Sequence, residues 1–179
     1  MARNESERTI TKELRIVMSC YNDIWKMRGQ IDKEWPTPGW VDSIKFAFTE
    51  SGEVMDAHMR IMGGYSRNNA KSMNLFDELA DLVMMLLTAL GSGVRDGEVI
   101  SGGFILMEED IPDGAFVITV CTMTSKLLLE EPNSQNGLYY ILAICVLIAS
   151  FFEARGHDLY DTLRGRLNRI RIRVSEEDK

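Results

Sequence analysis

The chain has 179 residues, of which 45% are hydrophobic and 26% charged, and its formal net charge is −7. This length and apolar content suit one compact domain, which we expect to cover residues 1–179. The negative charge argues against a protein that coats nucleic-acid polymers. An acidic protein can still bind a nucleotide if a metal ion lies between its carboxylates and the phosphates.

Helix-forming residues are common and only four prolines are present, so we expect an all-α fold. The first predicted helix covers about residues 7–27, with apolar side chains along one face. Glycines and prolines then predict a loop over 28–40. The second helix is expected from about 41 to 62, where a pair of glycines ends it.

The third predicted helix begins near Asn74, a residue type that favours the N-cap position, and ends at the glycines of 91–93. Residues 94–113 contain three glycines and a proline and are predicted to form a long connection. Within it, residues 104–107 suit either one turn of helix or a strand.

The fourth and fifth helices are predicted at about 115–130 and 138–154. The fifth is almost entirely apolar over 138–152, but fifteen residues are fewer than the roughly 20 that a membrane span requires. We therefore expect a buried bundle helix and no membrane partner. Gly156 ends it, Asp158 caps a sixth helix over about 159–174, and the prediction is a bundle of about six helices.

Two parts of the chain resemble each other. The fifth helix aligns with the third at an offset of 63 residues, and the fourth aligns with the second at an offset of 70. A degenerate duplication is therefore predicted, with a first repeat at about 40–93 and a second at about 114–174. Four acids of the first repeat align with apolar residues of the second: Glu50, Glu53, Glu78 and Asp81 align with Val120, Met123, Ile141 and Ile144.

These four acids form two pairs with a spacing of three residues, Glu50 with Glu53 and Glu78 with Asp81. A spacing of three places both carboxylates of a pair on one face of a helix. Two such helices packed antiparallel can direct four carboxylates at one point. Ligands that are all oxygen and highly charged favour Mg²⁺, with Mn²⁺ as a substitute. The sequence therefore predicts a metal site between the second and third helices.

The ExxE and ExxD pairs resemble the motif of the all-α nucleotide pyrophosphohydrolases, which include MazG and the dimeric dUTPases. Asp56 extends the first pair to the ExxExxD of the dimeric dUTPases. Arg164, Asn168 and Arg171 are similar to a basic residue, Asn and Arg late in these chains, although Lys is usual where Arg164 stands. The resemblance covers about 40–90 well and 156–174 loosely.

This resemblance implies a nucleoside triphosphate substrate, attack of water at the α-phosphorus, and release of a nucleoside monophosphate and pyrophosphate. Glu50, Glu53, Glu78 and Asp81 would bind Mg²⁺, and Glu50 or Glu53 would act as general base. Trp35 and Trp40 precede the second helix, where an indole could stack on a base. The expected substrate-binding residues are Arg164, Asn168, Arg171, Lys126, Trp40 and Asp56. The sixth helix also carries Arg166, Arg169 and Arg173, and most of its arginines are expected in solvent or at a subunit contact.

Two alternatives stay open. The first is a pyrimidine-specific dUTPase or dCTPase, which Asp56 weakly favours. The second is a non-catalytic helical dimerisation module, in which the acids are retained but no nucleotide is hydrolysed. Members of the superfamily that the chain resembles are usually dimers or tetramers, so we expect a homodimer or homotetramer. The charged first residues and the odd number of cysteines, three, predict a cytoplasmic protein.

Overall fold

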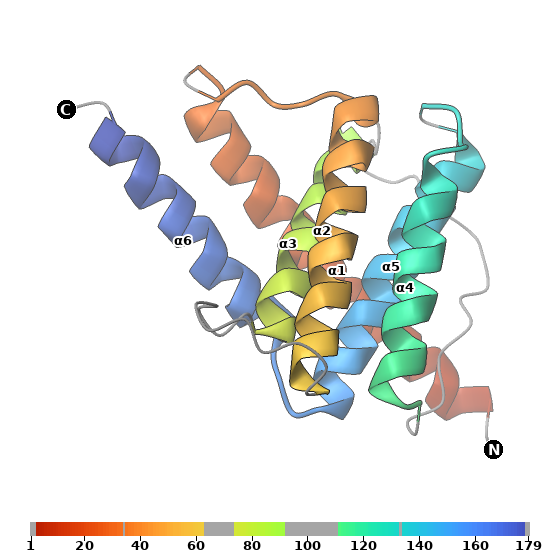
Figure 1. The fold of residues 1–179 in the computed structure, drawn as a ribbon. Coiled ribbons are helices and arrows are strands. Elements are labelled where there is room, and N and C mark those ends of the chain that lie inside the picture. Colours follow the sequence, from red (N-terminus) through yellow and green to blue (C-terminus); the bar gives the residue numbers. More distant parts are fainter. Residues whose placement is uncertain (1–2, 34, 63–73, 92–110, 133, 178–179) are drawn as a thin grey trace.

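The computed structural model describes residues 3–33, 35–62, 74–91, 111–132 and 134–177. This part of the chain forms six helices and no strand, which confirms the predicted all-α fold (Figure 1). The helices are α1 (Arg3–Ile31), α2 (Trp40–Ile61), α3 (Leu75–Leu90), α4 (Asp113–Leu127), α5 (Gln135–Ala154) and α6 (Leu159–Glu177). The polar connection after α2 and the segment 104–107 lie outside the described residues.

Two antiparallel hairpins form the centre of the fold (Figure 1). Helices α2 and α3 make the first hairpin, α4 and α5 make the second, and α2 packs against α4 while α3 packs against α5. Helix α1 crosses behind them and contacts α3, α5 and α6, and α6 also contacts α3. The buried apolar side chains of all six helices form one core.

Four of the predicted caps are present, whereas the glycine pair predicted to end α2 lies outside the described residues. The Asn74 side chain accepts a hydrogen bond from the backbone N–H of Phe76 at 3.1 Å, which fixes the start of α3. Gly91 and Gly156 end α3 and α5 with φ angles of +59° and +72°, a conformation that favours glycine. Asp158 accepts from the N–H of Asp161 at the start of α6.

Five predicted helix ends were wrong by three residues or more, including the start of α1 at Arg3 and the end of α6 at Glu177. Helix α1 continues to Ile31 because Met27 and Ile31 are buried and outweigh the cost of an internal Gly29. Helix α4 stops at Leu127, since the next three residues form i to i+3 turns. Helix α5 begins three residues early, at Gln135, because the Ser134 hydroxyl accepts from the N–H of Gly137.

Helix α5 is the most apolar helix and lies inside the bundle. It is long and apolar enough to cross a membrane, with a mean hydropathy of 2.0, but 61% of that window is buried within the fold. Core helices of soluble proteins have the same composition, so this feature is weak evidence for a membrane span.

The contacts between α2 and α4 fit the predicted duplication. The Cys121 thiol donates to the carbonyl oxygen of Ser51 at 3.2 Å, and these residues occupy equivalent positions at the offset of 70. Gly114 approaches His58, so the two helices cross antiparallel with Ser51 and Cys121 near the centre. Two copies related by a twofold axis would meet in this way. The duplication itself stays a prediction.

Replacing Gly137 with alanine is expected to destabilise the fold by about 1–3 kcal/mol, because an added methyl group overpacks a filled site. A Cβ there would lie 2.9 Å from two ring atoms of Trp40. Chemical denaturation measures the change. Gly165→Ala on α6 is the matched control, since nothing lies within 4 Å of its Cβ position, and it should be neutral or stabilising. Equal stability of the Gly137 variant and the parent would contradict this packing.

Glu13 gives the fold a pH dependence. Its side chain is buried on α1, and its Oε2 has no hydrogen-bond partner. Burial raises the pKa of Glu13 above its ordinary value of 4.5, and nearby Glu153 adds to this while Lys12 opposes it. A raised pKa in the folded state stabilises the protein below pH 4.5, and this stability is lost as the pH rises through the folded pKa.

Glu13→Gln should therefore be more stable than the parent at pH 8, with a smaller difference at pH 4. Urea unfolding at both pH values measures this, with the exposed Glu131→Gln as control. A Glu13 variant that is less stable than the parent at pH 8 would show that the charged carboxylate stabilises the fold.

Candidate functional site

Three carboxylates from two helices converge beside α6. Glu50 lies on α2 and Glu78 and Asp81 lie on α3, and one oxygen of each lies within 4.8 Å of the others. The antiparallel pairing of α2 and α3 (Figure 1) brings acids of both helices together. Glu78 and Asp81 are only 7% and 8% exposed. Burial of acids at such close range requires a cation, a proton or hydrogen-bond donors.

Glu53 adds a fourth acid next to this cluster. Burial raises the pKa of Glu78 most strongly, the negative charge of Glu53 is the next cause, and a hydrogen bond with Glu53 contributes further. Burial also raises the pKa of Glu50 to about 7, with Glu53 and Glu78 acting in the same direction. The predicted association of the four acids is therefore present in the folded chain, and it is held under electrostatic repulsion.

Arg166 of α6 partly neutralises the cluster. Its Nε donates to Oδ1 of Asp81 at 2.6 Å, and its Nη2 contacts Oδ2 of the same carboxylate. The guanidinium thus binds Asp81 through both oxygens, and its charge lowers the pKa of Glu50 and Glu78. Arg166 is thus an exception to the expectation for most arginines of this helix, because its side chain is only 27% exposed and meets an acid of its own chain.

The donor set suits a hard divalent cation. Glu50, Glu78, Asp81 and Glu53 offer only carboxylate oxygens, and no histidine or cysteine belongs to the group of potential ligands found in the described residues. Mg²⁺ and Mn²⁺ prefer such oxygens, whereas zinc sites in proteins are rich in nitrogen and sulfur. Burial first, and repulsion from the neighbouring acids second, raise the pKa of Glu50 and Glu78, and a bound divalent cation would oppose both effects. The residues therefore fit the predicted metal.

Three predicted substrate-binding residues lie elsewhere. Arg164, Asn168 and Arg171 line a small cavity of about 160 Å³ between α1 and α6, opposite Asp23, Lys26 and Gln30 of α1. None of the four acids lines this cavity. Within one chain, the α6 residue that reaches the acids is Arg166 in place of Arg164.

Asp56 and Lys126 are also separated from the acids. Asp56 pairs with Arg60 one turn further along α2 and is not among the converging carboxylates. Lys126 is exposed in the last turn of α4, on the hairpin in which apolar residues replace the acids. Asp56 follows Glu50 by six residues, which at about 100° per residue turns it about 120° round α2 from Glu50.

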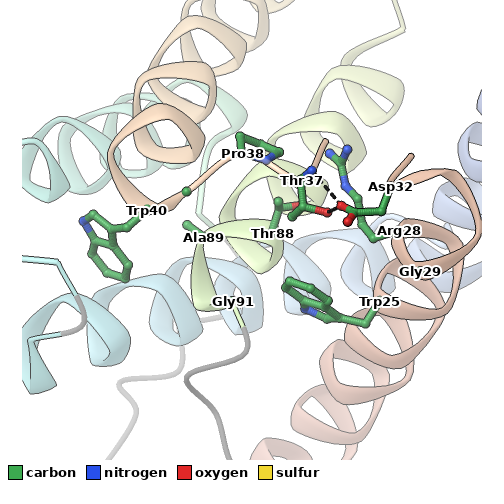
Figure 2. Close-up of a pocket in the computed structure, with 11 residues that line it drawn as sticks. Trp25, Arg28, Gly29, Asp32, Thr37, Pro38, Trp40, Thr88, Ala89 and Gly91 are labelled. Atoms are coloured by element: carbon green, nitrogen blue, oxygen red, sulfur yellow. Dashed lines mark hydrogen bonds between the residues drawn. The ribbon is translucent and has the colours of Figure 1, made fainter. Parts of the chain in front are cut away.

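Trp40 lines a larger cavity at the other end of the α2–α3 hairpin (Figure 2). This cavity has a volume of about 590 Å³ and lies between the C-terminal end of α1, the loop after it, and the adjoining ends of α2 and α3. Its wall includes Trp25, Arg28, Asp32 and Thr88, whereas Trp35 does not line it. Sequence reasoning missed Trp25 and Arg28, because α1 was expected to end before this loop.

Comparisons of the chain with protein-family models, with curated proteins and with solved structures found no match.

Proposed function

We propose that this protein is a Mg²⁺-dependent nucleoside triphosphate pyrophosphohydrolase, which cleaves its substrate between the α and β phosphates. The observation that carries the proposal is the convergence of Glu50, Glu78 and Asp81 within 4.8 Å, with the charge of Glu53 close enough to raise the pKa of Glu78. An acidic protein needs such a centre to bind a polyphosphate, because its carboxylates otherwise repel the substrate.

In this proposal Glu50, Glu53, Glu78 and Asp81 hold Mg²⁺, with Mn²⁺ as a substitute. The metal ion, when bound, offsets the phosphate charge and makes a bound water more acidic. Glu50 and Glu53 are the candidates for the general base, since both lie on the α2 side of the cluster and can accept a proton from the attacking water. The general base holds this proton while the bond to the pyrophosphate group breaks.

Among the residues that the structure describes, Arg166 is the cation in contact with the acid cluster, and it is the best candidate for a phosphate contact. In the free protein it binds Asp81, and its fork of donors suits phosphate oxygens equally well. Arg164, Asn168 and Arg171 line a separate cavity. They would need a bound substrate of considerable length, or a second chain, to act on the same nucleotide. A homodimer or homotetramer is therefore part of the proposal.

The position of attack tests this function. We expect incubation with Mg²⁺, a nucleoside triphosphate and ¹⁸O-labelled water to yield the nucleoside monophosphate and pyrophosphate, with the label in the monophosphate. Mass spectrometry of both products measures the label. Label in the pyrophosphate, or release of a nucleoside diphosphate and inorganic phosphate, would contradict attack at the α-phosphorus.

The other two readings predict different results. A pyrimidine-specific dUTPase or dCTPase would give the same products from one or two pyrimidine nucleotides alone. A non-catalytic dimerisation module would bind Mg²⁺ at the acids and release no product. The acids argue for catalysis, since burying them without a function imposes an electrostatic cost that the second repeat avoids with Val120, Ile141 and Ile144, all fully buried.

A further inference from the structure

The cavity that Trp40 lines contains two buried hydrogen-bond donors without partners. In the part of the chain that the structure describes, the N–H groups at Nε of Arg28 and Nε1 of Trp25 are buried and donate a hydrogen bond to no neighbour. Arg28 is only 9% exposed. An unsatisfied buried donor costs free energy, so each such group in a folded protein calls for an explanation. Both residues line the same cavity (Figure 2).

The buried Nε–H of Arg28 lacks a hydrogen-bond acceptor, although a negative charge lies nearby. Burial lowers the pKa of Arg28, but the carboxylate of Asp32 acts against this and supplies negative charge nearby. Asp32 directs its Oδ1 to the N–H and hydroxyl of Thr37, at 2.9 and 2.6 Å, and forms no ion pair with Arg28. A neutral oxygen acceptor would satisfy the free Nε–H without adding a second carboxylate.

The rest of the wall suits a flat ring. Trp25, Pro38, Trp40 and Ala89 supply apolar and aromatic surface, and about 590 Å³ is within the range of small-molecule sites. The Thr88 hydroxyl is committed as a donor to the carbonyl oxygen of Met84, at 2.8 Å. Stacking on indole rings together with a few directed donors is the usual way in which proteins bind planar heterocycles.

The cavity also lies at a suitable distance from the acids. Thr88 follows Asp81 by seven residues, so the two lie on one face of α3, about 10 Å apart along the helix. Met84 and Met85, each 9% exposed, occupy the turn between them. A nucleoside monophosphate unit, from phosphate through sugar to base, spans a comparable distance. A substrate held by the acids at its α-phosphate could therefore place its base in the cavity.

We propose that Arg28 and Trp25 determine base specificity, and that the cavity selects a carbonyl over an amino group at C6 of a purine or C4 of a pyrimidine: guanine over adenine, and uracil over cytosine. This inference rests on the proposed function for its ligand class, a nucleotide. The physical reason is the donor-only character of the free groups. A carbonyl oxygen accepts from them, whereas an amino group at the same position is itself a donor and leaves them unpaired. Arginine donors read the carbonyl edge of guanine in the same manner.

Binding of nucleosides without phosphate, in EDTA, tests the cavity separately from the metal site. Isothermal titration calorimetry should show guanosine binding at least ~10-fold more tightly than adenosine, and uridine more tightly than cytidine by a similar factor. Uridine and cytidine differ in whether a carbonyl or an amino group stands at C4, and guanosine and adenosine differ in the same way at C6. Guanosine also carries an amino group at C2, so inosine, which lacks that group, is titrated beside it and should keep the preference over adenosine.

Two variants test the assigned donors. Arg28→Met and Trp25→Phe keep the apolar parts of each side chain and remove the donor, and each should reduce the preference for the carbonyl base by ~10-fold or more. Arg28→Met should not lower the melting temperature, because an apolar residue replaces a buried unpartnered cation. The controls are Arg15→Met, an exposed cation on the same helix, and Trp35→Phe, an indole outside the cavity wall.

Equal affinity for carbonyl and amino bases, a preference that survives in both variants, or no nucleoside binding by the folded parent would each overturn the inference. The outcome is independent of hydrolysis. A carbonyl preference in a protein that hydrolyses no triphosphate would refute the proposed function and leave the base site standing. Hydrolysis of all nucleotides at equal rates would refute the base site alone.

Discussion

Asp81→Asn is expected to lower Mg²⁺-dependent hydrolysis by about 100-fold or more, because it removes a charged ligand from the proposed metal site while keeping the size of the side chain. The folded state should be retained, since the amide oxygen can still accept one hydrogen bond from Arg166. The rise in melting temperature on adding Mg²⁺ should shrink as well, because that rise depends on metal affinity. Steady-state kinetics and thermal unfolding measure the two effects.

Asp42→Asn is the matched control for this loss. Asp42 is an exposed acid in the first turn of α2, where it lies 3.6 Å from Lys45, and it is outside the cluster. The same chemical change there should leave both activity and the Mg²⁺ effect unaltered. A fully active Asp81→Asn protein would mean that the converging acids are not the catalytic centre.

Arg166→Met is expected to destabilise the metal-free protein by about 2–3 kcal/mol at neutral pH. Removing one partner of a mostly buried ion pair leaves Asp81 uncompensated beside Glu50 and Glu78. Addition of Mg²⁺ should restore most of this loss, since the metal replaces the missing charge. Activity should nevertheless fall at saturating Mg²⁺, because the proposed phosphate contact is absent. Denaturation with and without Mg²⁺ measures the stability change.

Arg164→Met provides the comparison on the same helix. Its guanidinium lies over the ring of Tyr160, at 5.6 Å from the ring centroid, and lines the α1–α6 cavity, apart from the acids. Its loss should change the stability little and should not alter the response to Mg²⁺. An Arg166 variant that is as stable as the parent in EDTA would show that the contact with Asp81 contributes little.

Helix content and most helix ends could be predicted because the signals are local. Asn74, Gly91, Gly156 and Asp158 act through hydrogen bonds or backbone angles within a few residues. The end of α1 could not be predicted, because Gly29 and the following prolines predict a loop, whereas burial of Ile31 in the tertiary fold extends the helix. Tertiary packing thus overrides a weak local preference there.

The acid cluster could be predicted because a spacing of three residues on consecutive helices fixes the face and the level of each carboxylate. The choice among the arginines of α6 could not, since neighbouring positions of a helix point in different directions that depend on its rotation. The buried Leu159, Leu163 and Leu167 set that rotation and turn Arg166 toward Asp81. The sequence did contain a signal for Arg166: the spacing of these leucines gives the buried face of α6, and the buried acids require a cation nearby.

Pyrophosphate release tests the central claim most directly. The measurement uses the eight canonical ribonucleoside and deoxyribonucleoside triphosphates and dUTP, with Mg²⁺ or with EDTA, for the parent protein and for Glu50→Gln. We predict release from at least one nucleotide with Mg²⁺, none in EDTA, and a severe loss in the variant. No release from any nucleotide, with Mg²⁺ or Mn²⁺ and a folded protein, would contradict the proposed hydrolase and favour a non-catalytic helical module.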